Sequence, residues 1–413
     1  MTCACLSSSP GHGQTAVSRP DTGVAAPRRA AQPGSELRVY LMTMGPGAEV
    51  WERFGHNAIW IDDPSVEPDT TYNYGLFDFQ QERFLLRFIR GQMWYWMAGI
   101  PAARYVQSYV GTNRSVWLQE LKLAPGARLE LREFLRWNER PENRFYHYDY
   151  YGDNCSTRVR DAIDRVIGGA IEAQTASLST GKTYRFHTQR LTANDPLIFT
   201  GLLLALGRGV DRPISAWEEM FLPVAMREHV RKVSVIGPDG TPIPLVAGER
   251  TLFESTATPP PDAPPSWLPW YLGLGAVVGA LVAVLGGAAR HGAMGRVGLG
   301  AVAVLWGGGA GLAGIVLAGL WAFTDHVMAY RNENLLQLNP LILGIALLVP
   351  LALAGSRRSA RWAGTLALGL ATLSLAGLVI QALPGFDQVN GPVIALALPI
   401  HLGFAMGMRR AFG

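Results

Sequence analysis

The chain has 413 residues, of which 49% are apolar and only 16% are charged. That charged fraction lies well below the roughly 25% of soluble domains. Charged side chains are frequent between residues 36 and 254 and rare after residue 267, which indicates water as the solvent of the first part and lipid as that of the second. The net charge of +4, without any long run of Lys and Arg, excludes nucleic acid as a partner.

The first 35 residues are rich in Ser, Pro, Gly and Ala, and we expect them to be disordered. They contain no apolar run of the ~7–15 residues that a signal peptide needs, although residues 3–14 resemble the polar end of one. We therefore expect this segment to be the remnant of a signal peptide whose start lies upstream. Cys3 and Cys5 lie in it, so Cys155 is the single cysteine of the folded region and no disulfide framework is predicted.

The elements predicted for residues 36–254 mix strand and helix patterns. In chain order they are a strand at 37–42, a hairpin pair at 57–61 and 72–75, a helix with an aromatic face at 79–90, a strand at 116–123, helices at 129–139 and 156–167, and a hairpin within 233–246 that turns at Asp239-Gly240. This order, without internal repeats, indicates an α+β domain.

Apolar segments dominate the rest of the chain. Residues 255–266 carry five prolines and are expected to form a semi-rigid, extended linker. Five apolar stretches follow, each close to the ~20 residues that cross a bilayer: 267–289, 297–323, 336–355, 362–383 and 391–408. We therefore expect residues 267–413 to form a transmembrane domain of about five helices.

The arginines between these stretches predict the orientation of the chain. They follow the first, third and fifth stretches, as Arg290, Arg296, Arg357, Arg358, Arg361, Arg409 and Arg410. The other two loops, 324–335 and 384–390, contain one Arg between them. Because basic residues mark the cytoplasmic side, we expect residues 36–254 to lie outside the cytoplasm and the C-terminus inside it.

Cys155 lies at the start of the predicted 156–167 helix, directly after the N-cap residues Asp153 and Asn154. It falls on the apolar face that Val159 continues, so its sulfur is expected at the helix N-terminus, turned toward the sheet. The positive end of the helix dipole favours a thiolate in that position. A solitary cysteine is also commonly a small buried hydrophobic residue, and its position alone leaves both interpretations open.

A thiol nucleophile needs a base, and His56 is the candidate. It begins the 57–61 strand on the face of Ala58 and Trp60, and Gly55 before it permits a close approach of another group. A histidine at the start of a strand is more often structural. His147, eight residues before Cys155, is the competing candidate, but its surroundings in the aromatic run 145–151 favour packing.

Three ordered motifs carry a family resemblance. They are Gly55-His56-x-Ala58-Ile59-x-Ile61, then Tyr72-Asn73-Tyr74-Gly75-x-Phe77-Asp78-Phe79, then Asp153-Asn154-Cys155-Ser156-Thr157 with Arg160-Asp161. The sequence resembles the Lnb N-terminal periplasmic domain family. The resemblance extends to Phe221-Leu222-Pro223 and covers most of residues 36–250. It also resembles lecithin:retinol acyltransferase-like enzymes, permuted relatives of NlpC-type peptidases. The implied fold is an α+β permuted papain-like (NlpC-like) domain followed by an all-α bundle of about five transmembrane helices.

The resemblance implies a cysteine-dependent lipoprotein N-acyltransferase, anchored in the bacterial inner membrane with its N-terminal domain in the periplasm. Its substrate would be a lipoprotein or phospholipid of the bilayer, and neither a metal nor another cofactor is expected. Cys155 would take the acyl chain as a thioester and His56 would act as base. The second His of the acyltransferase-like enzymes has no counterpart here, so Asn73 is preferred over Tyr74 and Asp78 as the orienting residue. Substrate contacts are assigned to Asn57, Tyr74, Asp78, Asn154 and His326.

Two other functions remain open. A cell-wall amidase or peptidase would use the same pair on an amide, and a membrane-anchored sensor or assembly module would use Cys155 only for packing. The assignment of His326 depends on the loop 324–339, which also contains Asp325, Asn332, Glu333, Asn334 and Asn339. An ordinary solvated loop is the alternative interpretation of that segment. Nothing in the sequence indicates the oligomeric state.

Overall fold

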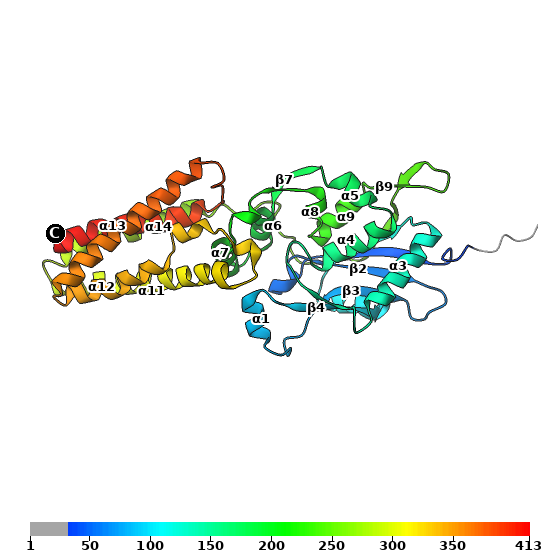
Figure 1. Cartoon of the computed structure of the whole chain (residues 1–413), viewed down its shortest axis with the longest axis horizontal. Helices are drawn as coiled ribbons and strands as arrows, with labels where there is room; N and C mark the ends of the chain where they lie inside the picture. The colour runs from blue at the N-terminus through cyan, green and yellow to red at the C-terminus, as the bar shows by residue number, and fades with distance from the viewer. Residues whose placement is uncertain (1–31) are drawn as a thin grey trace, which may run out of the picture.

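The computed structural model describes residues 32–413, so the expectations for residues 1–31 lie outside the described part of the chain. Figure 1 shows an elongated molecule in which a sheet with its covering helices occupies one end and a bundle of long helices occupies the other. The chain passes from the first part to the second through residues 254–267, between the last sheet strand and the first bundle helix.

A seven-stranded antiparallel sheet forms the frame of the N-terminal domain, in the order β11-β5-β1-β2-β3-β4-β6. Its strands are β1 (Arg38–Met44), β2 (His56–Asp62), β3 (Thr70–Leu76), β4 (Trp94–Pro101), β5 (Val116–Leu121), β6 (Phe145–His147) and β11 (Val246–Phe253). The expected hairpin of 57–61 and 72–75 is present, because β2 pairs antiparallel with β3 and Ala58 lies opposite Asn73.

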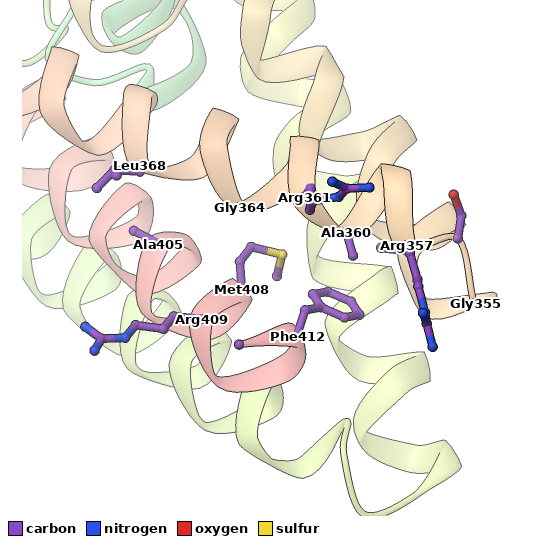
Figure 2. A pocket seen from close by; sticks show the side chains of 13 residues that line it. Gly355, Arg357, Ala360, Arg361, Gly364, Leu368, Ala405, Met408, Arg409 and Phe412 are labelled. Atoms are coloured by element: carbon purple, nitrogen blue, oxygen red, sulfur yellow. The ribbon is translucent and has the colours of Figure 1, made fainter.

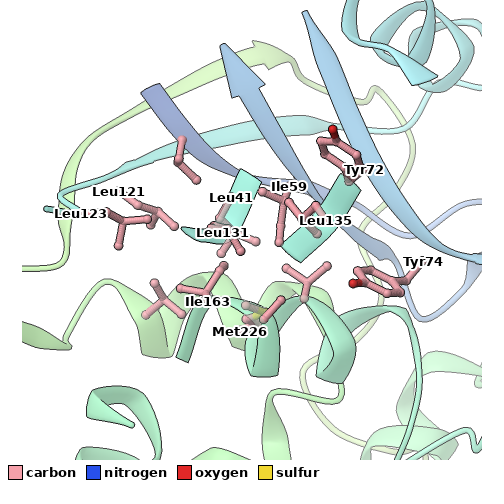
Figure 3. Packing of buried hydrophobic residues seen from close by; sticks show 14 of the residues in the cluster. Leu41, Ile59, Tyr72, Tyr74, Leu121, Leu123, Leu131, Leu135, Ile163 and Met226 are labelled. Atoms are coloured by element: carbon pink, nitrogen blue, oxygen red, sulfur yellow. The ribbon is translucent and has the colours of Figure 1, made fainter. Parts of the chain in front are cut away.

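Helices cover both faces of this sheet. On one face α3 (Pro125–Asn138), α4 (Cys155–Val166) and α9 (Pro223–Val230) enclose the main core. Figure 3 shows Leu41 and Ile59 of the sheet facing Ile163 and Met226 of the helices in that core. Burying each such side chain contributes roughly 1.5–3 kcal/mol. On the other face α2 (Ala102–Gly111) packs on Tyr40, Met42 and Ala58. The side chains of the neighbouring residues Ala58 and Ile59 therefore point into the cores on opposite faces of the sheet, as strand geometry requires.

The aromatic segment 79–90 differs from its expectation, because only its second half is helical, as α1 (Phe84–Arg90). Arg83 precedes α1 with a left-handed φ of 55°, which stops the helix from extending backwards. Asp78 accepts a hydrogen bond from the backbone N–H of Gln80 at 2.8 Å and holds Phe79 in a turn instead. The strand β4 was not predicted, because its two faces are both half-covered and its sequence lacks a polar alternation.

Smaller elements complete the N-terminal domain. They are α5 (Ala170–Thr175), β7 (Ser179–Thr183), α6 (Tyr184–Leu191), α7 (Pro196–Ala205), β8 (Pro213–Ser215) and α8 (Ala216–Glu219), followed by the hairpin of β9 (Ser234–Ile236) and β10 (Pro242–Pro244) that Asp239-Gly240 turns. Figure 1 places α6 and α7 on the side of the domain that faces the bundle.

Five apolar helical segments follow, each long enough to cross a membrane: Leu268–Ala288, Ala293–Phe323, Glu333–Leu353, Arg357–Ala382 and Gly391–Phe412. They contain α10 (Leu268–Ala288), α11 (Ala293–Phe323), α12 (Leu343–Leu353), α13 (Arg357–Val379) and α14 (Gly391–Phe412). α10 and α14 pack so closely that a Cβ on Gly279 or Gly403 would collide with the backbone of the other helix, as is common where small residues join membrane helices. The expected all-α bundle of five helices is confirmed.

The two parts of the molecule are docked together and not only joined by the linker. Phe199 and Leu203 of α7 belong to the hydrophobic core of the bundle. The last carbonyl groups of α7 accept hydrogen bonds from the side chains of Asn332 and Asn334, which come from the segment between α11 and α12. Both asparagines are buried, so the later part of the loop 324–339 is not an ordinary solvated loop, whereas Asp325 in its first part is exposed. The two asparagine amides satisfy a helix end that no intrahelical bond can satisfy.

The opposite end of the bundle carries a basic hollow of about 920 Å³ between α12, α13 and α14. Figure 2 shows Arg357, Arg361 and Arg409 around it, with Leu368, Met408 and Phe412 on its apolar side. Basic residues therefore gather at the end of the bundle that lies far from the sheet domain.

Candidate active site

Cys155 is the first residue of α4, and Asn154 caps that helix. The Asn154 side-chain oxygen accepts hydrogen bonds from the backbone N–H groups of Ser156 (2.8 Å) and Thr157 (3.0 Å). Its amide nitrogen donates to the carbonyl oxygens of Tyr150 and Phe221. Every polar atom of this side chain is thus occupied by protein, so Asn154 positions Cys155 and has no free group for a substrate.

A hydrogen bond joins α4 to the beginning of β2. The Ser156 hydroxyl donates to the side-chain oxygen of Asn57 at 2.7 Å, and the Asn57 amide donates to the Thr43 hydroxyl at 2.9 Å. The backbone N–H of Asn57 also favours the charged form of the Cys155 thiol. These contacts hold the thiol beside the strand residue that follows His56. Asn57, predicted to contact substrate, is fully buried and serves this connection.

Three side chains converge on Gly75, the residue of β3 next to this junction. A Cβ on Gly75 would lie 3.2 Å from the Cys155 Cβ, 3.5 Å from the His56 Cε1 and 3.9 Å from the Tyr146 hydroxyl oxygen. Gly75 also has a φ of +96°, which residues other than glycine rarely adopt. The bare backbone of Gly75 therefore leaves space between the Cys155 Cβ and the edge of the His56 ring.

Asn73 orients the His56 ring. The two residues share one face of the β2–β3 pair, and the His56 Nε2 lies 2.5 Å from the Asn73 side-chain oxygen. An amide oxygen can only accept, so Nε2 carries the proton and Nδ1 keeps the lone pair of a base. The Tyr109 ring stacks on the imidazole at 6.3 Å between centroids. Of Asn73, Tyr74 and Asp78, the three residues considered for this position, the structure brings only Asn73 to the ring.

Burial determines the charge state of the pair. It lowers the pKa of His56 from 6.5 to about 4, and the nearby Arg114 guanidinium acts in the same direction. It raises the pKa of the Cys155 thiol from 9.0 to about 11, although backbone N–H groups of Asn57 and Ser156 favour the thiolate. Burial thus opposes the thiolate that the helix N-terminus was expected to stabilise. Near neutral pH the site holds a neutral thiol and a neutral imidazole.

The remaining predicted site residues lie elsewhere. The Tyr74 hydroxyl is buried and donates to the Asn138 side-chain oxygen at 2.7 Å. Asp78 lines an open hollow of about 540 Å³ with Trp94 and Arg144, which Cys155 does not line. His326 donates from Nε2 to the Phe88 carbonyl at 3.0 Å. Tyr74 is thus occupied by the core, whereas Asp78 and His326 lie beside α1 and β4.

Tyr146 is a site residue that the sequence analysis missed. Its side chain is only 6% exposed, and its hydroxyl is a buried polar atom without a hydrogen-bond partner among the described residues. Burial raises its pKa well above the usual range, so the hydroxyl keeps its proton. Phe145 and His147 on either side are exposed, and the strand alternation within the aromatic run 145–151 was the signal that pointed to an inward-facing Tyr146. His147, the competing base, stacks on Trp94 at 4.0 Å.

Within residues 32–413 no three His, Cys, Asp or Glu side chains lie close enough together to hold a metal ion. The groups around Gly75 offer the chemistry of a thiol beside a base, an orienting amide and a hydroxyl donor.

Residues 26–193 match the family described as the Lnb N-terminal periplasmic domain, and residues 276–408 match the Lnb transmembrane domain. No curated protein and no solved structure matches the chain. The two matches lie in the order of the two structural parts, and each falls on the part that its description leads one to expect. The chain therefore belongs to the Lnb family, as a multi-pass membrane protein with a periplasmic N-terminal domain.

Proposed function

We propose that the protein is a cysteine-dependent acyltransferase that moves an acyl chain from a lipoprotein or phospholipid ester to an amine. The observation that carries the proposal is the convergence of Cys155, His56 and Tyr146 on the bare backbone of Gly75. A thiol, an oriented base and an unpaired hydroxyl donor are the groups that acyl transfer needs. The bundle supports a substrate that resides in the bilayer.

In the first half of the reaction, the Cys155 sulfur attacks the carbonyl carbon of the ester while the His56 Nδ1 takes the thiol proton. The ester C–O bond then breaks, the leaving alkoxide receives that proton from the imidazolium, and a thioester remains on Cys155. In the second half an amine attacks the thioester and loses a proton to His56. The amide forms, and the thiol leaves with its proton restored. The neutral resting pair suits this cycle because the base starts unprotonated.

Charge on the carbonyl oxygen in the transition state needs hydrogen-bond donors. The N–H groups of Ser156 and Thr157 already donate to Asn154, so they are poorly placed for this task. The Tyr146 hydroxyl has no competing partner in the described part of the chain, and the backbone N–H groups of Asn57 and Cys155 favour negative charge at the sulfur. We assign the oxyanion site to these three donors.

Two finer features belong to the proposal: the fold of the N-terminal domain and the orientation of the chain in the membrane. We propose a permuted papain-like (NlpC-like) arrangement for the N-terminal domain, supported by a nucleophile at the N-terminus of α4 that follows the histidine strand β2 in the chain. We also propose the bacterial inner membrane, with a cytoplasmic C-terminus. The basic residues around the hollow in Figure 2, at the bundle end away from the periplasmic domain, support this orientation.

The direct test is isolation of the acylated enzyme. The full-length protein in nanodiscs is incubated with a diacylated lipoprotein that carries an isotopically labelled ester chain, without an amine acceptor. We expect the labelled chain on the peptide that contains Cys155, removable by neutral hydroxylamine as a thioester. Labelled enzyme that is stable to hydroxylamine, or no labelled enzyme while a muropeptide amide is cleaved, would refute the acyltransferase and favour the amidase.

The rate of acyl transfer should depend little on pH around neutrality. Because burial depresses the pKa of His56 to about 4, the imidazole stays neutral and able to accept a proton until the pH falls toward that value. We expect the acid limb of the kcat/KM profile near pH 4, well below the 6.5 of an exposed histidine. Activity after return to neutral pH controls for unfolding, and an acid limb at 6.5 would contradict this electrostatic account.

Replacing Tyr146 by Phe should lower kcat by about 10²–10³-fold, the usual effect of losing one oxyanion donor. The aromatic ring, its packing on Tyr74 and the Arg158 guanidinium over its face all remain, and the lost hydroxyl has no protein partner within residues 32–413. Stability should therefore stay unchanged while turnover falls. Single-turnover acylation, followed beside thermal unfolding, separates the two, and equal turnover in the variant would remove Tyr146 from the mechanism.

A further inference from the structure

The short helix α1 exposes apolar side chains that the sheet domain leaves uncovered. Leu85, Leu86, Phe88 and Ile89 are 68%, 42%, 44% and 52% exposed. Trp51 and Phe79, whose rings lie 5.8 Å apart, continue the exposed apolar surface beside them. We call these six residues the apolar rim. A contiguous apolar surface of this kind on a protein in water marks a contact with another apolar phase.

Contacts with the bundle fix the position of α1 relative to the end of α11. The backbone N–H of Asp325 donates to the Arg90 carbonyl at 2.7 Å, and the Gln92 side chain donates to the Asp325 carboxylate at 2.8 Å. His326 donates to the Phe88 carbonyl at 3.0 Å. Asp325 follows the end of α11 at Phe323 by two residues. α1 is therefore attached where a membrane-crossing helix leaves the bilayer on its periplasmic side, and Figure 1 shows it on the side of the sheet domain that faces the bundle.

A row of aromatic rings leads inward from α1. Phe84 packs on Phe79 at 5.2 Å between centroids, Phe79 on Phe77 at 4.9 Å, Phe77 on Tyr95 at 5.1 Å, and Tyr95 on Tyr148 at 4.1 Å. We call these five residues the aromatic track. Tyr148 lies 6.4 Å from the ring of Tyr146, whose hydroxyl faces the Gly75 junction with Cys155. The five rings are partly exposed, so they present an apolar surface that runs from α1 to Tyr148, beside the buried Tyr146.

The charges around α1 indicate which kind of apolar partner it contacts. Arg83, Arg87 and Arg90 lie on or beside the helix, with Glu82 as the single acidic residue of the segment 82–91. An exposed apolar surface flanked by arginines is typical of segments that lie in the headgroup region of a bilayer, where the guanidinium groups meet lipid phosphates. A soluble protein partner would not account for the attachment of α1 to the end of α11.

We propose that the apolar rim lies in the periplasmic leaflet and that the aromatic track binds one acyl chain of a membrane lipid between that leaflet and Cys155. The inference rests on the proposed function to the extent that the bound chain is the one that Cys155 receives. It assigns the chain-binding surface of the enzyme to the segment 77–95 and to Tyr148. The substrate therefore reaches Cys155 from the bilayer, along α1, and not from the aqueous periplasm.

Alkylthiolation of Cys155 tests chain binding without requiring catalysis. In a Cys3→Ser/Cys5→Ser background in nanodiscs, the rate of modification is measured with hexadecyl and with methyl methanethiosulfonate. We expect Leu85→Ser/Phe88→Ser/Ile89→Ser and, separately, Phe77→Ala to lower the hexadecyl-to-methyl rate ratio by about tenfold or more. The methyl rate should remain unchanged, which shows that the site is folded. Ile236→Ser, at an exposed apolar residue of the distant β9 hairpin, is the matched control and should keep the ratio.

An unchanged ratio in both the α1 variant and Phe77→Ala would overturn the proposal. A second measurement does not depend on the Cys155 thiol. An environment-sensitive fluorophore is attached to Leu85→Cys in a Cys3→Ser/Cys5→Ser/Cys155→Ala background. Spin-labelled lipids should quench it, whereas the same fluorophore on Glu172→Cys should not be quenched. An unquenched label at position 85 would also overturn it. If these binding results hold while no acyl transfer occurs, the proposed function fails and the lipid-binding surface stands.

Discussion

Replacing Cys155 by Ala is expected to lower kcat/KM for acyl transfer by at least about 10⁴-fold, the scale on which enzymes lose rate when a covalent nucleophile is removed. The reason is that no other described residue presents a thiol at the Gly75 junction, and the neutral imidazole of His56 cannot form the thioester by itself. Mass spectrometry of the lipoprotein N-terminus, with the full-length variant in nanodiscs, measures the product.

His56→Ala should lose activity on the same scale, because the pKa of about 11 leaves almost no thiolate without a base. His147→Ala is its matched control: this residue is exposed and its ring packs on Trp94 of β4, so activity should stay within about a factor of three. Membrane insertion and protease resistance should be the same in all three variants. A Cys155→Ala protein that still acylates its substrate would leave only a packing role for the thiol.

The second large effect concerns stability. Arg185 is almost fully buried and pairs with the equally buried Asp211 at 2.7 Å. It also donates to the carbonyl oxygens of Leu203, Leu206 and Gly207 at the end of α7. Arg185→Met leaves the Asp211 carboxylate buried without its partner, which costs about 3–5 kcal/mol. We expect a large loss of thermal stability in detergent and faster proteolysis around residues 206–213.

An exposed ion pair supplies the control for this variant. Arg38 and Glu120 are joined by two hydrogen bonds on the open surface of the sheet, and Arg38→Gln should cost no more than about 1 kcal/mol. The double variant Arg185→Met/Asp211→Leu should recover part of the loss, since it removes the unpaired charge. If Arg185→Met were no less stable than Arg38→Gln, the attachment of α7 would have to depend on other contacts.

Local patterns were sufficient for the elements that carry Cys155 and His56. The alternation of 57–61 and the apolar stripe of 156–167 are strong periodic signals, and β2, β3 and α4 follow them closely. The N-cap preference of Asn154 also predicts the start of α4 correctly. A polar side chain in such a motif, however, does not disclose its partner. The sequence predicts Asn57 and Asn154 as substrate contacts, whereas both hold the thiol in place through buried hydrogen bonds.

Features that depend on tertiary burial could not be predicted. The helix dipole favours a thiolate at Cys155, but the buried environment raises its pKa more strongly, and no local pattern reports the depth of burial. Tyr146 looked like one of many packing aromatics because its missing partner is visible only in three dimensions. At ten residues, α7 was too short to resemble a membrane span, so its docking into the bundle was not expected.

The capped end of α7 has a practical consequence for protein engineering. The residues that complete this helix come from the segment between α11 and α12, about 130 positions further along the chain. A water-soluble fragment cut within the proline-rich segment would carry bare carbonyl groups and uncovered Phe199 and Leu203, and we expect it to aggregate. Chimeras between relatives should therefore exchange 196–207 and 328–339 as one unit, because neither segment has its hydrogen-bond partners without the other.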